Sequence, residues 1–238
     1  MTSDDSWAAS RVHPPRRDEQ TVVVCGTAGG VGTSVIAALL ADRRAATTLG
    51  ESSWWIDAAG NDGDLELRTR ASGDPDLLRT EFGTGLYLAR EEDTISGSVA
   101  YAWSRDAVPV VDVGARAMSV LPDLAEGPLA ELMIPVMVMS PRPDLLNRAK
   151  VFLDQWQRAG VLRRTIIVIN PQVPDVDDHA LREPLVTAVS GQVAGVVAFE
   201  YDPVLGSGRA LDRSAQPVLS PSTVAAVTEL IAATSSSN

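Results

Sequence analysis

A glycine-rich loop near the start of the chain carries the residue types best suited to chemistry. The segment VVVCGTAGGVGTSVIAALLA, residues 22–41, runs from β-branched residues through glycines to a hydroxyl pair and an apolar stretch. Glycines let successive backbone N–H groups turn toward a phosphate, and the start of a helix behind them favours the same anion. We therefore expect a nucleotide to bind at Gly29, Gly30, Val31, Gly32, Thr33 and Ser34.

The loop only partly follows the phosphate-binding pattern G-x4-G-K-[ST]. Ser34 falls at the position of the magnesium-binding hydroxyl, but Thr33 replaces the lysine and Thr27 replaces the first glycine. Thr33 has no charge to place against the β- and γ-phosphate oxygens. Losing one charge-assisted hydrogen bond costs about 1.5–3 kcal/mol, which is about tenfold to a hundredfold in affinity. The sequence therefore predicts weak nucleotide binding.

The same glycines leave two alternatives open. Gly26, Gly30 and Gly32 also fit G-x3-G-x-G, the dinucleotide loop of short-chain dehydrogenases, with Asp57 placed to take a ribose hydroxyl. Those enzymes use a Tyr-x3-Lys pair. Here the residues four positions after Tyr87, Tyr101 and Tyr201 are Glu91, Arg105 and Leu205, which argues against an NAD(P)-binding enzyme. The other alternative is a strand–turn–helix that serves tight packing only.

Apolar runs and helical stretches alternate along the chain. Seven runs are typical of strands buried on both faces: residues 21–25, 53–57, 84–88, 108–113, 134–139, 165–170 and 194–199. Residues 33–46, 143–159, 177–190 and 221–234 have helical character. This alternation predicts an α/β fold, doubly wound, with a mostly parallel sheet of about seven strands and helices on both faces. Ligands of such sheets bind beyond the carboxyl ends of the strands, where the glycine loop begins.

Composition limits the other classes of function. The 238 residues carry a net charge of −11, which argues against unassisted binding to DNA or anionic membranes. One cysteine, Cys25, and two histidines leave little for a disulfide or a zinc site. No segment has the roughly 20 apolar residues of a membrane span, and the N-terminus lacks the apolar centre of a signal peptide. We expect a cytoplasmic protein with a disordered arm at 1–19, one domain at 20–234 and a frayed tail at 235–238.

Taken in order, the motifs resemble the ParA/MinD family of dimeric P-loop ATPases, whose deviant Walker A loop reads KGGxGKT[ST]. AGGVGTS, residues 28–34, is that loop with both lysines replaced, at Ala28 and Thr33. WWIDAAGNDGDLELR, residues 54–68, resembles the second strand and its loop: Asp57 matches the first aspartate of an Asp-x-Asp pair. Ala59 stands where the second, water-positioning aspartate is expected, and Asp62 and Asp64 are out of register.

Later segments extend the resemblance to about residue 232. VPVVDVG, residues 108–114, is similar to the Walker B strand, so Ser34, Asp57 and Asp112 are the implied magnesium site. IIVIN ends at Asn170, which matches the family's base-contacting asparagine. Residues 84–90, 136–156 and 196–218 resemble further family segments. Asp57, Asp112 and Asn170 could instead be ordinary turn residues at strand ends.

The resemblance implies a protein that has lost catalytic charges. Both loop lysines and the water-positioning aspartate are replaced, and only Arg116 and Arg142 are placed to compensate. The implied function is that of a degenerate family member resembling TadZ/CpaE-like localisation proteins: a pseudo-ATPase that binds ATP or ADP with Mg weakly or not at all. It would act as a homodimeric scaffold or spatial regulator, with a protein partner in a secretion, pilus or partition machine. The alternative is an active ATPase.

Basic residues do not favour DNA or membrane partners. The last predicted helix, STVAAVTELIAATSSSN, has no lysine or arginine, unlike the family's membrane-binding tips. The pairs Arg43–Arg44 and Arg163–Arg164 are interpreted as solvated charges rather than as a DNA-binding stripe.

Overall fold

The computed structural model describes residues 20–59, 69–74, 77–90, 93–174, 178–208, 211–212 and 218–235. The predicted arm at 1–19, Asp62, Asp64 and residues 236–238 of the predicted tail lie outside the described residues. Ser235 ends the last helix. Among the described residues, no helix is both long enough and apolar enough to cross a bilayer.

A nine-stranded sheet forms the centre of the fold, in the order β3-β4-β5-β2-β6-β1-β7-β8-β9. The seven strands from β5 to β9 in that order are parallel and correspond to the seven predicted runs. The strands are β1 (Thr21–Gly26), β2 (Ser53–Asp57), β3 (Ser72–Asp74), β4 (Leu77–Arg79), β5 (Gly85–Leu88), β6 (Val108–Asp112), β7 (Met133–Met139), β8 (Ile166–Ile169) and β9 (Gly195–Ala198). The predicted fold class is confirmed.

The strands β3 and β4 were not predicted. They form an antiparallel hairpin that extends the sheet beyond β5. Each has only three residues, and Gly73 in β3 has a φ of 137°, so neither strand is long enough to show a periodic apolar pattern.

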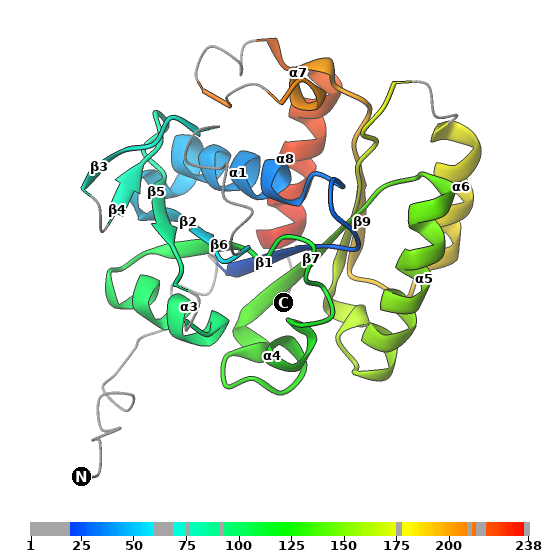
Figure 1. The fold of residues 1–238 in the computed structure, drawn as a ribbon, viewed down its shortest axis with the longest axis horizontal. Coiled ribbons are helices and arrows are strands. Elements are labelled where there is room, and N and C mark those ends of the chain that lie inside the picture. The colour runs from blue at the N-terminus through cyan, green and yellow to red at the C-terminus, as the bar shows by residue number, and fades with distance from the viewer. Residues whose placement is uncertain are drawn as a thin grey trace.

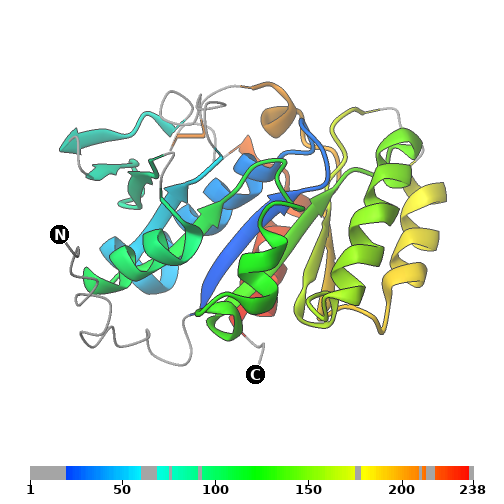
Figure 2. The ribbon, with the colours of Figure 1, turned by 60° about the horizontal axis from the view of Figure 1, so that its bottom comes forward.

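Helices cover both faces of the sheet (Figures 1 and 2). They are α1 (Thr33–Arg44), α3 (Ile95–Ser104), α4 (Leu121–Glu126), α5 (Pro143–Arg158), α6 (Asp178–Val189), α7 (Pro203–Gly206) and α8 (Pro221–Ser235). One apolar core lies between the sheet and α1 with α8; the other lies beneath α3, α4 and α5. In Figure 2, α3, α4, α5 and α6 lie in front of the sheet, and α1 and α8 lie behind it.

The first helix is buried around most of its circumference. Its chain continues as a π-helical turn at Ala45–Leu49, so α1 ends slightly earlier than predicted. Arg44, at its last residue, is 4% exposed. Its guanidinium donates to the Gln20 carbonyl oxygen and to Oγ1 of Thr234. The interpretation of Arg44 as a solvated charge was therefore wrong: it joins α1 to the start of β1 and to α8.

Arg164 also departs from the predicted solvated role. Its guanidinium is half-buried and donates to the carbonyl oxygens of Leu124, Ala130 and Met133. Burial lowers its pKa. The side chain therefore holds α4 and the start of β7 together. A surface DNA contact would need this guanidinium to be free.

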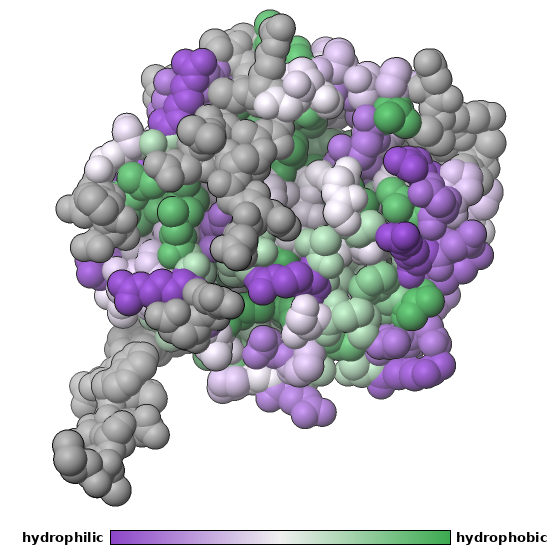
Figure 3. Space-filling view, viewed as in Figure 1, coloured by the Kyte–Doolittle hydropathy of each residue, from purple (hydrophilic) through white to green (hydrophobic). Residues whose placement is uncertain are grey.

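Large hydrophobic side chains at the surface are scattered. Figure 3 shows mainly hydrophilic side chains over the α5–α6 side of the molecule, with hydrophobic residues in separate patches. The exposed large hydrophobic residues come from different elements: Leu88, Leu132, Val151, Val173, Val218 and Val224. Singly exposed residues of this kind are normal for a globular protein.

Asp42 is a buried carboxylate that ties α1 to the turn between β4 and β5. It is 2% exposed, and its Oδ1 accepts hydrogen bonds from Oγ1 of Thr80 (2.8 Å) and Oγ1 of Thr84 (2.6 Å). Burial raises the pKa of Asp42 from 3.8 to about 6, although both hydroxyls lower it. The folded protein therefore binds this proton more tightly than the unfolded chain does.

This shift predicts an unusual pH dependence of stability. The stabilisation from protonated Asp42 is fully present below pH 4 and is lost as pH rises through about 6. A difference of about two pKa units between the folded and unfolded states corresponds to about 3 kcal/mol in the free energy of unfolding. We expect Asp42→Asn, which keeps an acceptor for both hydroxyls, to be more stable than the wild type at pH 7.5 and equal to it at pH 4, by urea unfolding. Glu229→Gln, on the exposed side of α8, is the control. An Asn variant less stable at pH 7.5 would contradict the prediction.

Candidate functional site

The glycine loop begins at the centre of the sheet. β1 lies between β6 and β7, and all six of its residues are buried. At its end, the Gly26 N–H donates to the Gly114 carbonyl oxygen (2.8 Å), and the Thr27 N–H donates to the Val138 carbonyl oxygen (3.0 Å). The entry to the loop is thereby fixed at the carboxyl ends of both neighbouring strands, where the predicted nucleotide site lies.

Glycine is required at two positions of the loop. Gly30 has a φ of 76° and Gly32 a φ of 87°, in the left-handed region that other residues rarely adopt. Gly29 and Gly30 are exposed, whereas the side chain of Val31 is fully buried and anchors the loop. Gly32 is the N-cap of α1, and its carbonyl oxygen accepts from the Ile36 N–H (3.0 Å).

The backbone N–H groups of residues 28–35 are the main feature of the loop. None of them donates a hydrogen bond to any residue that the structure describes. The first N–H groups of a helix have no partner within the helix and commonly bind an anion or a capping side chain. No side chain among the described residues caps α1. The loop and the helix start together can therefore donate to phosphate oxygens.

The two hydroxyl residues have different surroundings. Thr33 is 6% exposed, and its Oγ1 lies against Gly26, where a Cβ atom would collide with it. The position of the missing lysine is thus occupied by a short side chain inside the loop. Ser34 is half-buried, and its hydroxyl lies near the carboxylate of Asp112.

Asp57 and Asp112 are brought together at the ends of adjacent strands. They are paired residues of β2 and β6, and the Ala58 N–H donates to the Asp112 carbonyl oxygen (2.8 Å). Oδ1 of Asp57 accepts from the Ala59 N–H (3.0 Å), and Oδ1 of Asp112 accepts from the Gly114 N–H (2.9 Å). Asp112 is fully buried, and its Oδ2 accepts no hydrogen bond within the described part of the chain.

The charge of Asp112 is costly where it lies. Burial raises its pKa from 3.8 to about 6, and the nearby Asp57 raises it further. The Ser34 hydroxyl, the Gly114 N–H and Arg116 lower it. A divalent cation would neutralise the two carboxylates and satisfy the buried Oδ2. Magnesium is commonly held by one or two carboxylates together with substrate phosphates, so Ser34, Asp57 and Asp112 fit a magnesium–phosphate site. Within the described residues, no cluster of three or more His, Cys, Asp or Glu could hold a metal alone.

Asn170 lies beside the loop. It is 4% exposed at the end of β8, and its Nδ2 donates to the Val31 carbonyl oxygen (2.9 Å). Its contact with a base stays a prediction. Gln172 makes the same contact from its Nε2 (3.2 Å) and was missed by the sequence analysis. A signal was available, because residues two apart in an extended chain point to the same side.

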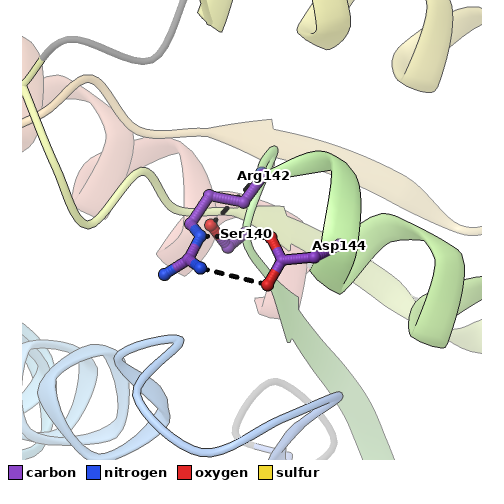
Figure 4. Close-up of polar contacts among 3 residues, drawn as sticks. All are labelled: Ser140, Arg142 and Asp144. Atoms are coloured by element: carbon purple, nitrogen blue, oxygen red, sulfur yellow. Dashed lines mark hydrogen bonds and ion pairs between the residues drawn. The ribbon is translucent and has the colours of Figure 1, made fainter.

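The two candidate arginines are placed differently. Figure 4 shows Arg142 at the start of α5, where its Nε and Nη2 donate to the carboxylate of Asp144 (3.2 and 3.0 Å). Its backbone N–H donates to Oγ of Ser140. The guanidinium charge of Arg142 is paired with Asp144 of the helix that follows it. Arg116 is exposed and donates from Nε to the Val113 carbonyl oxygen (3.2 Å), yet it lowers the pKa of Asp112. Of the two arginines, Arg116 is the one near the carboxylates.

Other residues pack around this region of the sheet. Cys25 is fully buried beneath the loop, and burial and the nearby Asp112 raise its pKa, so its thiol is unreactive. Trp54 and Trp55 belong to the two different cores on opposite faces of the sheet. Ala59 lies against Gly114, where a Cβ atom would be 3.1 Å from its Cβ. Position 59 is therefore next to the turn that follows Asp112.

The strand order argues against the dehydrogenase alternative. The dinucleotide-binding fold has the order 3-2-1-4-5-6, in which the second strand pairs with the first. Here β2 pairs with β5 and β6, and β6 separates β2 from β1. Asp57 is therefore not on a strand next to that of the glycine loop, as the dinucleotide fold requires.

Comparisons with known proteins agree with this fold. No protein-family model and no curated protein sequence matches the chain. A chain of the MinC:MinD cell division protein complex of Aquifex aeolicus has a TM-score of 0.61 at 15% identity, covering 90% of this chain and 96% of its own. A ParA family ATPase of Chlorobium tepidum TLS has a TM-score of 0.55 at 15% identity, covering 91% and 98%. A plasmid partition protein of Borrelia burgdorferi B31 bound to AMPPNP has a TM-score of 0.54 at 13% identity, covering 90% and 98%. The fold is therefore similar to that of ParA and MinD proteins.

Proposed function

We propose that this chain is a degenerate ParA/MinD-like protein that binds MgATP or MgADP weakly at its glycine loop and hydrolyses ATP slowly or not at all. The proposal depends on the position of the loop N–H groups next to the buried carboxylate of Asp112. Backbone donors of residues 28–35 without a described protein acceptor lie at the same sheet edge as Asp112, whose buried Oδ2 has no described donor. An anion and a divalent cation bound together would complement both.

The lost charges bear on hydrolysis more than on binding. Phosphoryl transfer depends on positioning and on electrostatic stabilisation of the transition state. Removing one such stabilising group typically costs about 10²–10³ in rate. Here Ala28 and Thr33 are uncharged, Ala59 has no carboxylate, and Arg142 is paired with Asp144. The loop can hold a phosphate through its backbone while lacking the charges that accelerate its transfer.

An active ATPase is the second candidate function, and one observation favours it. Burial raises the pKa of Asp112 overall, and the guanidinium of Arg116 is one of three groups that lower it. A cation this near to the proposed phosphate site could take part of the missing lysine's role. The Arg116→Gln variant separates the candidates, because only an active enzyme would lose turnover.

The proposed cellular role is that of a scaffold or spatial regulator. We propose a cytoplasmic homodimer that recruits a protein partner in a secretion, pilus or partition machine, as the resemblance to TadZ/CpaE-like proteins implies. The structural neighbours include a MinC:MinD complex and a plasmid partition protein, which supports a partner-dependent role. The net charge of −11 and the inward-facing Arg44 and Arg164 argue against direct DNA binding.

Calorimetric titration tests the proposal. We expect the protein to bind ATP and ADP in the presence of magnesium, more weakly when magnesium is removed with EDTA, and to show no affinity for NADPH. Phosphate release in the same samples should equal that of the buffer. Absence of ATP binding would contradict nucleotide recognition. Turnover that depends on Arg116 would favour the active ATPase, and tight NADPH binding would restore the dehydrogenase alternative.

A further inference from the structure

Two side-chain amides converge on one carbonyl of the glycine loop. Asn170 donates from Nδ2 (2.9 Å) and Gln172 from Nε2 (3.2 Å) to the carbonyl oxygen of Val31. Both follow β8, which is separated from β1 by β7. A carbonyl oxygen has two lone pairs, so these two donors satisfy it completely.

The backbone at Gly32 shows that this contact is close. Its φ of 87° already favours glycine. In addition, a Cβ atom at Gly32 would collide with Nδ2 of Asn170 and would lie 3.0 Å from Nε2 of Gln172. The two amides therefore pack directly on the backbone of the loop, and a side chain at position 32 would displace them.

The contact determines the orientation of a peptide group. A trans peptide is planar, and its C=O and N–H point in opposite directions. Because the Val31 carbonyl points toward the amides after β8, the N–H of Gly32 points away from them. That N–H is one of the loop donors with no acceptor among the described residues. A rotated peptide would instead direct the carbonyl oxygen at a bound phosphate, and the two like charges would repel.

We propose that Asn170 and Gln172 are positioning residues for anion binding: together they hold the Val31–Gly32 peptide with its N–H directed into the phosphate site. This inference rests on the proposed nucleotide function and deepens it. It also changes the expected role of Asn170 from contact with a base to support of the loop. Thr27 fixes the entry of the loop on β7 through the Val138 carbonyl, and the amides fix its exit on β8. The loop is pre-organised at both ends without lysine.

Binding of two ligands distinguishes support of the loop from contact with a base. ATP and inorganic tripolyphosphate share the phosphate chain, but tripolyphosphate has no base. We expect Asn170→Ala with Gln172→Ala to weaken both ligands by the same factor, about tenfold for the loss of two hydrogen bonds. The full-length protein is titrated with each ligand in the presence of magnesium. Asn147→Ala with Gln157→Ala, on the exposed side of α5, is the matched control.

The pattern of losses decides the outcome. If Asn170→Ala weakens ATP but leaves tripolyphosphate unchanged, then Asn170 contacts the base and the inference is overturned. If the wild type binds neither ligand, then the proposed function fails, and the next measurement still decides the inference.

Hydrogen exchange of the ligand-free protein tests the orientation of the loop directly. We expect the Ile36 amide, which donates to the Gly32 carbonyl oxygen, to exchange at least about tenfold faster in the double variant, because Gly32 can move once the neighbouring Val31 carbonyl is released. Exchange in the core strands β1 and β7 should be unchanged, which excludes global destabilisation. Exchange of the Ile36 amide equal to that of the wild type would overturn the inference.

Discussion

Restoring both lysines, as Ala28→Lys and Thr33→Lys, is expected to tighten MgATP binding by about tenfold to a hundredfold. One charge-assisted contact on a phosphate contributes about 1.5–3 kcal/mol, and the backbone donors that it would assist are already in place. Thr33 lies inside the loop against Gly26, so a lysine at this position begins its path within the loop. Isothermal titration with ATP measures the effect.

The same variant should remain a poor ATPase. Ala59 still has no carboxylate to position a water molecule, and this position lies beside the Gly114 turn after Asp112. We expect hydrolysis to rise only when Ala59→Asp is added. The matched control is Ala225→Lys with Thr228→Lys on the exposed side of α8, which adds the same charge on another helix. An affinity equal to that of the control would mean that the loop does not hold the phosphate chain.

Neutralising Asp112 is expected to stabilise the protein and to abolish the effect of magnesium. Asp112→Asn removes a charge that is fully buried, next to Asp57, and incompletely hydrogen-bonded within the described residues. Its Oδ1 could still accept from the Gly114 N–H. A pKa raised by about two units corresponds to about 3 kcal/mol of folding free energy lost at neutral pH, where the carboxylate is charged. Mutational effects of this size commonly come from a cavity or from an unpaired buried charge.

Two measurements on Asp112→Asn test both parts of the prediction. Thermal unfolding at pH 7 should show a higher midpoint than the wild type, whereas Glu229→Gln should not change it. Adding MgATP should raise the midpoint of the wild type but not that of the variant, because ligand binding stabilises only the state that binds it. A variant that is less stable and still responds to MgATP would show that the charge of Asp112 does not destabilise the fold and that Asp112 is not a magnesium ligand.

The sequence was most informative where a pattern depends on local chemistry. Apolar runs located the seven parallel strands because five of them are buried throughout, and β5 and β9 are partly buried. The family resemblance implied that Asp57 and Asp112 lie together, and they are paired residues at the ends of two parallel strands. Gly30 and Gly32 were identified correctly as turn residues because their backbone needs a positive φ.

Other features depend on contacts between distant parts of the chain. Asn170 and Gln172 reach Val31 across about 140 residues; their spacing indicates that they share one side of the chain, but not what they contact. The burial of Arg44 depends on Thr234 at the other end of the chain, so its sequence neighbours gave the wrong environment. The pair of Arg142 and Asp144 is local by contrast, and α5 begins between the two residues, at Pro143.

The burial of Arg44 has a consequence for the electric field at the loop. Aligned peptide dipoles give a helix about half a positive charge at its first residue and about half a negative charge at its last. Arg44 places its positive charge in the last turn of α1, inside the protein and against Thr234 of α8. The positive pole faces the glycine loop and is left uncompensated by any acidic residue in the first turn. Part of the cationic character that this loop lost from its side chains thus persists in the macrodipole of the helix behind it.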